Sequence, residues 1–188
     1  EKGTLTDPKL LTAHAQRILK SGASEEFIRT FTEQWLGTRK LPDIMPDPRL
    51  TNVSSQNLRD LKSESQLFFK EILTKNLPLE TFIKPGFTYL SAGTAKRFYG
   101  INKVKSKNLT RVSLPKETPY GGVLGMASIM MATANGVDTE PVLRGVWVLE
   151  NVLGTPPPPP PNNIPAITPD TRGSKTIRDL LEAHRAEE

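Results

Sequence analysis

The apolar residues of the first half of the chain recur at three- and four-residue spacing, the period of amphipathic helices. A first helix is predicted after a Thr6 cap with Pro8 in its first turn, a second from about Ser24 to a stop at Gly37, and a third from near Ser54. The residues predicted to face inward are Leu11, His14, Ala15 and Ile18 in the first helix, Phe27, Ile28, Phe31 and Trp35 in the second, and Leu58, Leu61, Phe68 and Ile72 in the third, with Phe69 and Leu73 beside them.

The stretches that follow these helices carry weaker patterns. Residues 41–51 include three prolines, which cannot donate to a helix ladder, so an extended connection is predicted there. From residue 82 to residue 115 the helical period fades, apart from a short helix over residues 91–99 that ends at Gly100. Residues 104–114 alternate loosely, and both a strand and a loop remain open for them.

Helical patterning returns over residues 120–131, and again after Thr139, where Pro141 suits a first turn. This later helix is predicted to end at Gly154 and to place Val142, Val146, Leu149 and Leu153 on one face, with Trp147 flanking it. Six prolines, residues 156–161, then predict a rigid polyproline II spacer. A last short helix from Ser174 would carry Ile177, Leu180, Leu181 and His184 on one stripe.

These patterns predict a mainly α fold, an irregular multi-helix domain with at most a small β element and the polyproline II spacer. Residues 1–115 would form a helical domain and residues 116–155 a helix pair packing on it, with Trp147 and Leu149 against the first-half helices. Residues 156–173 would be the proline spacer and a loop, and residues 174–188 a short helix leading to a following domain.

Composition excludes several classes of protein. No stretch approaches the roughly 20 apolar residues of a membrane span. The absence of cysteine excludes disulfides, thiolate zinc sites and thiol nucleophiles within these residues. There is no Walker A loop, no Gly-x-Ser-x-Gly elbow and no His-Glu-x-x-His, and Gly121, Gly122 and Gly125 are only a fragment of a dinucleotide fingerprint. No catalytic or metal-binding residue is predicted, and the two histidines, His14 and His184, are expected to be half-buried on apolar stripes.

The net charge of +5 is unevenly distributed, because no acidic residue lies between Glu80 and Glu117. Two interpretations of this basic stretch from Lys84 to Lys116 stay open: a site for an anionic partner, or a solvated loop and helix face. Nucleic acid is not expected, because no nucleic-acid-binding fold is recognisable. The cations of the stretch are Lys84, Lys96, Arg97, Lys103, Lys105, Lys107, Arg111 and Lys116.

One long segment carries a family signature: residues 144–155, RGVWVLENVLGT, followed directly by the six prolines and by Asn163, Ile164 and Pro165. It closely resembles the planctomycete-type, cytochrome-c-associated domains of unknown function, which occur in large exported bacterial proteins. Further segments resemble successive motifs of two adjacent domains of that family, namely residues 31–37 (FTEQWLG), 64–69 (ESQLFF), 87–90 (FTYL), 97–101 (RFYGI), 111–115 (RVSLP) and 121–124 (GGVL).

The resemblance implies a role and a location. In family members a helix like residues 180–185 leads into a Cys-x-x-Cys-His haem-attachment motif, so haem c is expected in a following domain of the parent protein, and no cofactor within this chain. The chain would then be a non-catalytic scaffold of an exported, periplasmic c-type cytochrome-like protein, and His184 would lie near the haem. Whether the parent is an oxidoreductase stays open. Glu140 stands where members often have serine, and the family supplies no catalytic residues to carry over.

A recognition module for polysaccharide or protein is the alternative. Five rings could offer stacking faces, and their exposure distinguishes the two hypotheses, because buried rings favour a scaffold and exposed rings favour recognition. The rings are Trp35, Tyr89, Tyr99, Tyr120 and Trp147.

Overall fold

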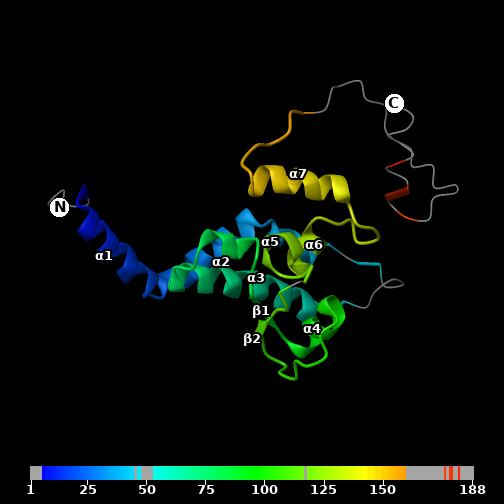
Figure 1. Cartoon of the computed structure of the whole chain (residues 1–188), viewed down its shortest axis with the longest axis horizontal. Helices are drawn as coiled ribbons and strands as arrows, with labels where there is room; N and C mark the ends of the chain where they lie inside the picture. The colour runs from blue at the N-terminus through cyan, green and yellow to red at the C-terminus, as the bar shows by residue number, and fades with distance from the viewer. Residues whose placement is uncertain are drawn as a thin grey trace. The chain divides into compact units, whose positions relative to one another are not determined.

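The computed structural model describes residues 6–44, 46–47, 53–116, 118–159, 176, 178–179 and 182. The chain divides into two compact units, Glu1–Ala132 and Thr133–Glu188, which are described separately. The first unit is mainly helical with one small sheet (Figure 1), so the predicted fold class is confirmed. The predicted boundaries at residues 115, 155 and 173 stay predictions.

The first two helices of the first unit, α1 and α2, differ in how many of their side chains are buried. α1 (Pro8–Leu19) begins at Asp7, whose side chain accepts a hydrogen bond from the Lys9 amide at 2.8 Å, so the predicted Thr6 cap is wrong by one residue. None of its residues is buried, and His14 is exposed rather than half-buried. α2 (Ala23–Trp35) buries Ile28, whereas the predicted inward residues Phe27 and Phe31 are largely exposed.

The 3-10 helix η2 (Thr38–Asp43) occupies part of the stretch that was predicted to be extended. Gly37, just before it, has a φ of +71°, which confirms the predicted stop of α2 at a left-handed glycine. Pro42 sits inside this short helix, and Leu41 is fully buried. The prediction is wrong here because Pro42 removes a single amide donor from a short i→i+3 ladder. The bonds from the Lys40 amide to the Gly37 carbonyl and from the Ile44 amide to the Leu41 carbonyl, both 3.3 Å, remain.

α3 (Ser55–Lys75) is the central element of the unit, and it contacts α2, η2, β1, α4 and α6. It begins where the sequence predicts: Ser54 Oγ accepts from the Asn57 amide, and Asn57 Oδ1 accepts from the Ser54 amide, both at 3.2 Å. It ends at Asn76, whose φ of +49° is left-handed. Of the predicted stripe, Leu61, Phe68 and Ile72 are buried as expected.

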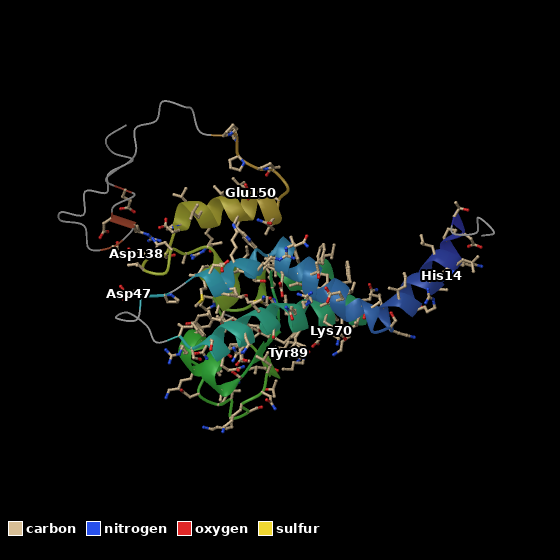
Figure 2. The ribbon with its side chains drawn as sticks, turned by 180° about the vertical axis from the view of Figure 1, so that it is seen from behind. His14, Asp47, Lys70, Tyr89, Asp138 and Glu150 are labelled. Atoms are coloured by element: carbon tan, nitrogen blue, oxygen red, sulfur yellow. The ribbon has the colours of Figure 1, made fainter. Side chains whose placement is uncertain are left out.

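A two-stranded antiparallel sheet and α4 (Ala92–Tyr99) lie on one side of α3 (Figures 1 and 2). β1 (Phe87–Leu90) pairs with β2 (Thr110–Ser113) in a register that sets Phe87 opposite Ser113 and Leu90 opposite Thr110. β2 is the part of residues 104–114 that forms a strand, and β1 was not predicted. α4 ends at Gly100, with a φ of +64°, as the sequence predicts.

The remaining elements of this unit are short. η3 (Leu79–Phe82) precedes the sheet, and the region predicted as one helix over residues 120–131 forms α5 (Gly122–Gly125) and α6 (Ala127–Ala132) instead. The break falls at Met126, whose ψ of 132° is extended. The core that these elements enclose with α3 consists of Leu41, Leu61, Leu90, Ala95, Tyr99, Val112 and Ala127.

The described part of the second unit contains α7 (Pro141–Asn151), with Pro141 in its first turn and Gly154 left-handed after it, as predicted. Trp147, predicted to flank the apolar face, is the buried residue of this helix at 8% exposure, while Val142 and Leu153 are largely exposed. Residues 155–159 are exposed and form neither helix nor strand. Residues 160–161 and most of the predicted last helix lie outside the described residues. None of the described helices is long and apolar enough to span a membrane.

Candidate functional site

Three carboxylates of α3 point into the unit rather than to solvent. Asp60, Glu64 and Glu71 are all buried, and they stand four and seven residues apart. That spacing places them near one face of the helix, beside Leu61 and Phe68. Buried carboxylates need hydrogen-bond partners, and here each one has at least one partner outside α3.

Glu64 is the most deeply enclosed carboxylate, with no exposed surface. Its Oε1 accepts hydrogen bonds from the Thr88 hydroxyl of β1 at 2.5 Å and from the Tyr99 hydroxyl of α4 at 2.6 Å. The Tyr99 oxygen in turn accepts from the Ala127 amide at the start of α6 at 2.9 Å. One glutamate therefore links α3, the sheet, α4 and α6.

The surroundings of Glu64 raise its pKa to about 7, because burial penalises the charged carboxylate more than the two hydroxyl hydrogen bonds stabilise it. Its Oε2 is enclosed and has no hydrogen-bond partner among the described residues. Burial and the neighbouring Glu64 raise the pKa of Tyr99 well above its ordinary value, so this hydroxyl keeps its proton as a donor.

Glu71, two turns further along α3, accepts hydrogen bonds from one hydroxyl and two cationic side chains. It accepts from the Tyr89 hydroxyl, from Lys75 at 3.1 Å and from Arg111 Nε at 3.0 Å, while the Arg111 guanidinium lies 4.1 Å from the centre of the Phe87 ring. Burial acts to raise the pKa of Glu71, but these hydrogen bonds outweigh it and lower the pKa. Burial and the bond to Glu71 raise the pKa of Tyr89 to about 12. Tyr89 is labelled in Figure 2.

Asp60 anchors the start of α4, where Ser91 donates to it at 2.6 Å and Gln56 donates at 2.7 Å. Ser91 is also the N-cap of α4. The hydrogen bonds of the three carboxylates thus hold α3 against the sheet and α4. None of the three lines the cleft described next.

A cleft of about 530 Å³ opens elsewhere on the same unit, between the turn at residues 83–86 and residues 114–116 and 118–121, with Leu124 and Gly125. Gly121, at a φ of +83°, lines the cleft, and Gly122, at a φ of +60°, follows it directly in the chain. A Cβ on Gly121 would lie 2.3 Å from Leu114 Cδ1, and one on Gly122 would lie 2.6 Å from the Phe82 carbonyl oxygen. These glycines therefore serve close packing, and the cleft is shaped by backbone.

The structure describes most of the residues predicted as functional. His184 lies outside the described residues, and His14 is exposed on α1 (Figure 2). Of the five rings, Tyr99 and Trp147 are buried, Trp35 and Tyr89 are half-buried, and Tyr120 is exposed. Trp35 packs edge-on against Phe82 with ring centroids 5.2 Å apart. No group of three or more His, Asp or Glu side chains suited to a metal ion occurs among the residues that the structure describes.

The sequence contains a signal for the buried carboxylates, although they were not among the predicted functional residues. Asp60, Glu64 and Glu71 fall on the apolar stripe of a helix that was itself correctly predicted. The cations of the basic stretch are exposed, which fits both interpretations of it. Arg111 is the one for which an ion pair is found among described residues.

Two protein-family models match this chain. The family model of PSD4, described as a protein of unknown function (DUF1592), matches residues 1–101, more than half of the chain. The chain belongs to the PSD4 family. A second model, PSCyt3, also a protein of unknown function (DUF1588), matches residues 120–188, so two domains lie side by side in the sequence. Both are planctomycete-type domains often associated with cytochrome c, which confirms the resemblance. Neither a curated protein nor a solved structure matches this chain.

Proposed function

We propose that this chain is a non-catalytic helical scaffold in an exported, multidomain c-type cytochrome-like protein, where it supports an adjacent haem domain that transfers electrons. The observation that carries this proposal is the pair of adjacent matches to cytochrome-associated domains. The interior of the first unit supports it, because the buried carboxylates of α3 are bonded to structural hydroxyls and cations rather than set around a reactive centre. The burial of Tyr99 and Trp147 also favours a scaffold over a recognition surface.

The haem itself would have to be held outside this chain. Covalent attachment of haem c uses the two cysteines of a Cys-x-x-Cys-His motif, and the chain has no cysteine. The histidine that the structure describes, His14, is exposed on α1 and is not part of a pocket suited to a porphyrin. The residues that the structure describes therefore offer no covalent haem attachment site, and no redox step is assigned to them.

The experiment is to produce the parent protein in a host that exports and matures c-type cytochromes. Two variants with the same substitution give the test: Leu61→Ala, at a residue with no exposed surface, and Leu79→Ala, at a residue that is 79% exposed. We expect a covalent c-type absorption spectrum in all three proteins. Leu61→Ala should lower the melting temperature and shift the reduction potential of the haem, while Leu79→Ala should change neither.

Two results would refute the proposal. One is a parent protein without covalent haem. The other is a Leu61→Ala variant in which this segment is destabilised while the haem domain keeps its melting temperature and its potential. Secretion is checked by finding the parent in the periplasmic or extracellular fraction. The proximity of His184 to the haem is tested in the same background, because His184→Ala should then change the spectrum or the potential.

A further inference from the structure

The cleft between residues 83–86 and residues 114–116 and 118–121 is not explained by a scaffold role. Its size lies within the roughly 300–1,000 Å³ of small-molecule sites, and it belongs entirely to the first unit. One wall is closely packed, because Gly121 and the adjacent Gly122 lie against Leu114 and Phe82 and the Gly121 amide donates to the Gly125 carbonyl at 3.2 Å. A cleft built in this way exists before any ligand arrives, so little ordering is needed for binding.

Cationic and aromatic groups line this cleft together. Lys84 and Lys116 are exposed, and neither forms an ion pair with any residue that the structure describes. Tyr120, at 40% exposure, is the exposed ring among the five aromatic candidates. Its other side packs edge-on against the buried Tyr99 at a centroid distance of 5.5 Å, which holds the ring in place.

We infer that this cleft binds an anionic sugar chain, whose carboxylate or sulfate groups pair with Lys84 and Lys116 while a sugar ring stacks on Tyr120. Charge complementarity selects an anion, and the exposed ring and Leu124 select a ligand with an apolar face.

The backbone of the cleft argues against an acidic peptide as the ligand. Extended peptides are held mainly by main-chain hydrogen bonds, and three of the lining residues, Pro85, Pro115 and Pro119, have no amide proton to donate. A sugar ring needs no such ladder, because it is held by stacking and by its substituents. The inference is independent of the proposed scaffold role, since it concerns a surface and not the interior.

The test is a binding titration of the whole chain with four probes: a heparin oligosaccharide, a polygalacturonate oligosaccharide, neutral dextran and poly-glutamate. The expected result is binding of at least one anionic sugar, no binding of dextran, and an affinity for poly-glutamate about tenfold weaker or worse. The two anionic sugars distinguish sulfate from carboxylate as the recognised group. Inorganic sulfate, as a competitor, should displace the sugar only at much higher concentration, because it lacks the stacking ring.

Two double variants separate the cleft from the general basic charge. Lys84→Gln with Lys116→Gln should weaken sugar binding about tenfold, which equals about 1.4 kcal/mol for the loss of two exposed charge pairs. The matched pair Lys103→Gln with Lys107→Gln removes the same charge from exposed positions of the basic stretch outside the cleft, and should weaken binding less than about twofold. Tyr120→Leu, with an unchanged melting temperature, should weaken binding about fivefold.

Three results would overturn the inference. The first is that neither anionic sugar binds. The second is that the two double lysine variants lose the same amount of sugar affinity. The third is that poly-glutamate binds as tightly as the sugars. If Tyr120→Leu fails to fold, the two lysine pairs still decide the question, because both leave the packing of Tyr99 and Tyr120 intact.

Discussion

Replacing Glu64 with glutamine should remove a pH dependence that the fold itself creates. The amide keeps an oxygen to accept from Thr88 and Tyr99, and it differs from the carboxyl chiefly in that it cannot ionise. The amide nitrogen would stand at the position of Oε2, which has no partner among described residues. That mismatch costs the variant some stability, but by an amount that does not vary with pH.

The size of the effect follows from the pKa. An unfolded glutamate has the ordinary value of 4.5, and the folded Glu64 has a pKa of about 7. Between these values the folded chain keeps the proton that the unfolded chain has released, so stability falls as pH rises, by about 1.4 kcal/mol per pH unit. Stability from this residue is fully present below pH 4.5, and about 3 kcal/mol is lost once the pH has passed through the folded pKa.

Urea unfolding measured between pH 4.5 and pH 8 checks this value. A Trp147→Phe background leaves Trp35 as the sole tryptophan, so that fluorescence reports on the first unit. We subtract the free energy of unfolding of the Trp147→Phe background from that of the same protein carrying Glu64→Gln. This difference should rise by about 3 kcal/mol across this range. Glu80→Gln, at an exposed residue, is the matched control, and its free energy of unfolding should vary with pH as that of the Trp147→Phe background does.

Parallel curves for Glu64→Gln and its parent, within about 0.5 kcal/mol, would refute the reasoning. Glu64 would then ionise at the same pH folded and unfolded. The picture of an enclosed carboxyl held by Thr88 and Tyr99 would have to be abandoned.

Three further predictions concern backbone and packing. Gly122→Ala should lower the free energy of unfolding by more than about 2 kcal/mol, because the added Cβ would lie 2.6 Å from the Phe82 carbonyl oxygen at a φ of +60°. Gly145→Ala, inside α7 with open space around it, should raise the free energy of unfolding by up to about 1 kcal/mol. Thermal melting of the two variants compares them. Asn76→Gly should stabilise the chain by about 0.5–1 kcal/mol, since it relieves a left-handed φ of +49° at the end of α3, and an unchanged or lower urea midpoint would contradict this. Trp147→Ala should cost about 3–5 kcal/mol because its ring is buried, and a change in melting too small to measure would show that the burial contributes nothing.

Local signals in the sequence were sufficient for most of the helices. Ser54 with Asn57, Ser91, Pro141 and the glycines after α2, α4 and α7 act on residues within one turn of themselves, so the ends of these helices could be read directly. The partners of a strand lie further away. β1 is four residues long and pairs with residues about twenty positions later, and no local pattern encodes that pairing.

The candidate sites were harder to predict for a related reason. An acidic residue on a helix is most often solvated, and only the positions of Thr88, Tyr99 and Arg111 make Glu64 and Glu71 acceptable inside. The cleft depends on the meeting of two loops about thirty residues apart. Its glycines were noted in the sequence, but their purpose became visible only once Leu114 and Phe82 were seen against them.

The links around Glu64 also bear on how the two family segments are inherited. The PSD4 match stops at residue 101, yet β1 is paired with a strand at residues 110–113 and Tyr99 receives the amide proton of Ala127. A gene recombined at the edge of the first match would therefore lose half of a sheet, and Tyr99, which donates to Glu64, would lose the amide of Ala127. We expect exchange between lineages to preserve the chain through Ala132, the end of the first compact unit, and chimaeras joined there to express better than those joined at residue 101.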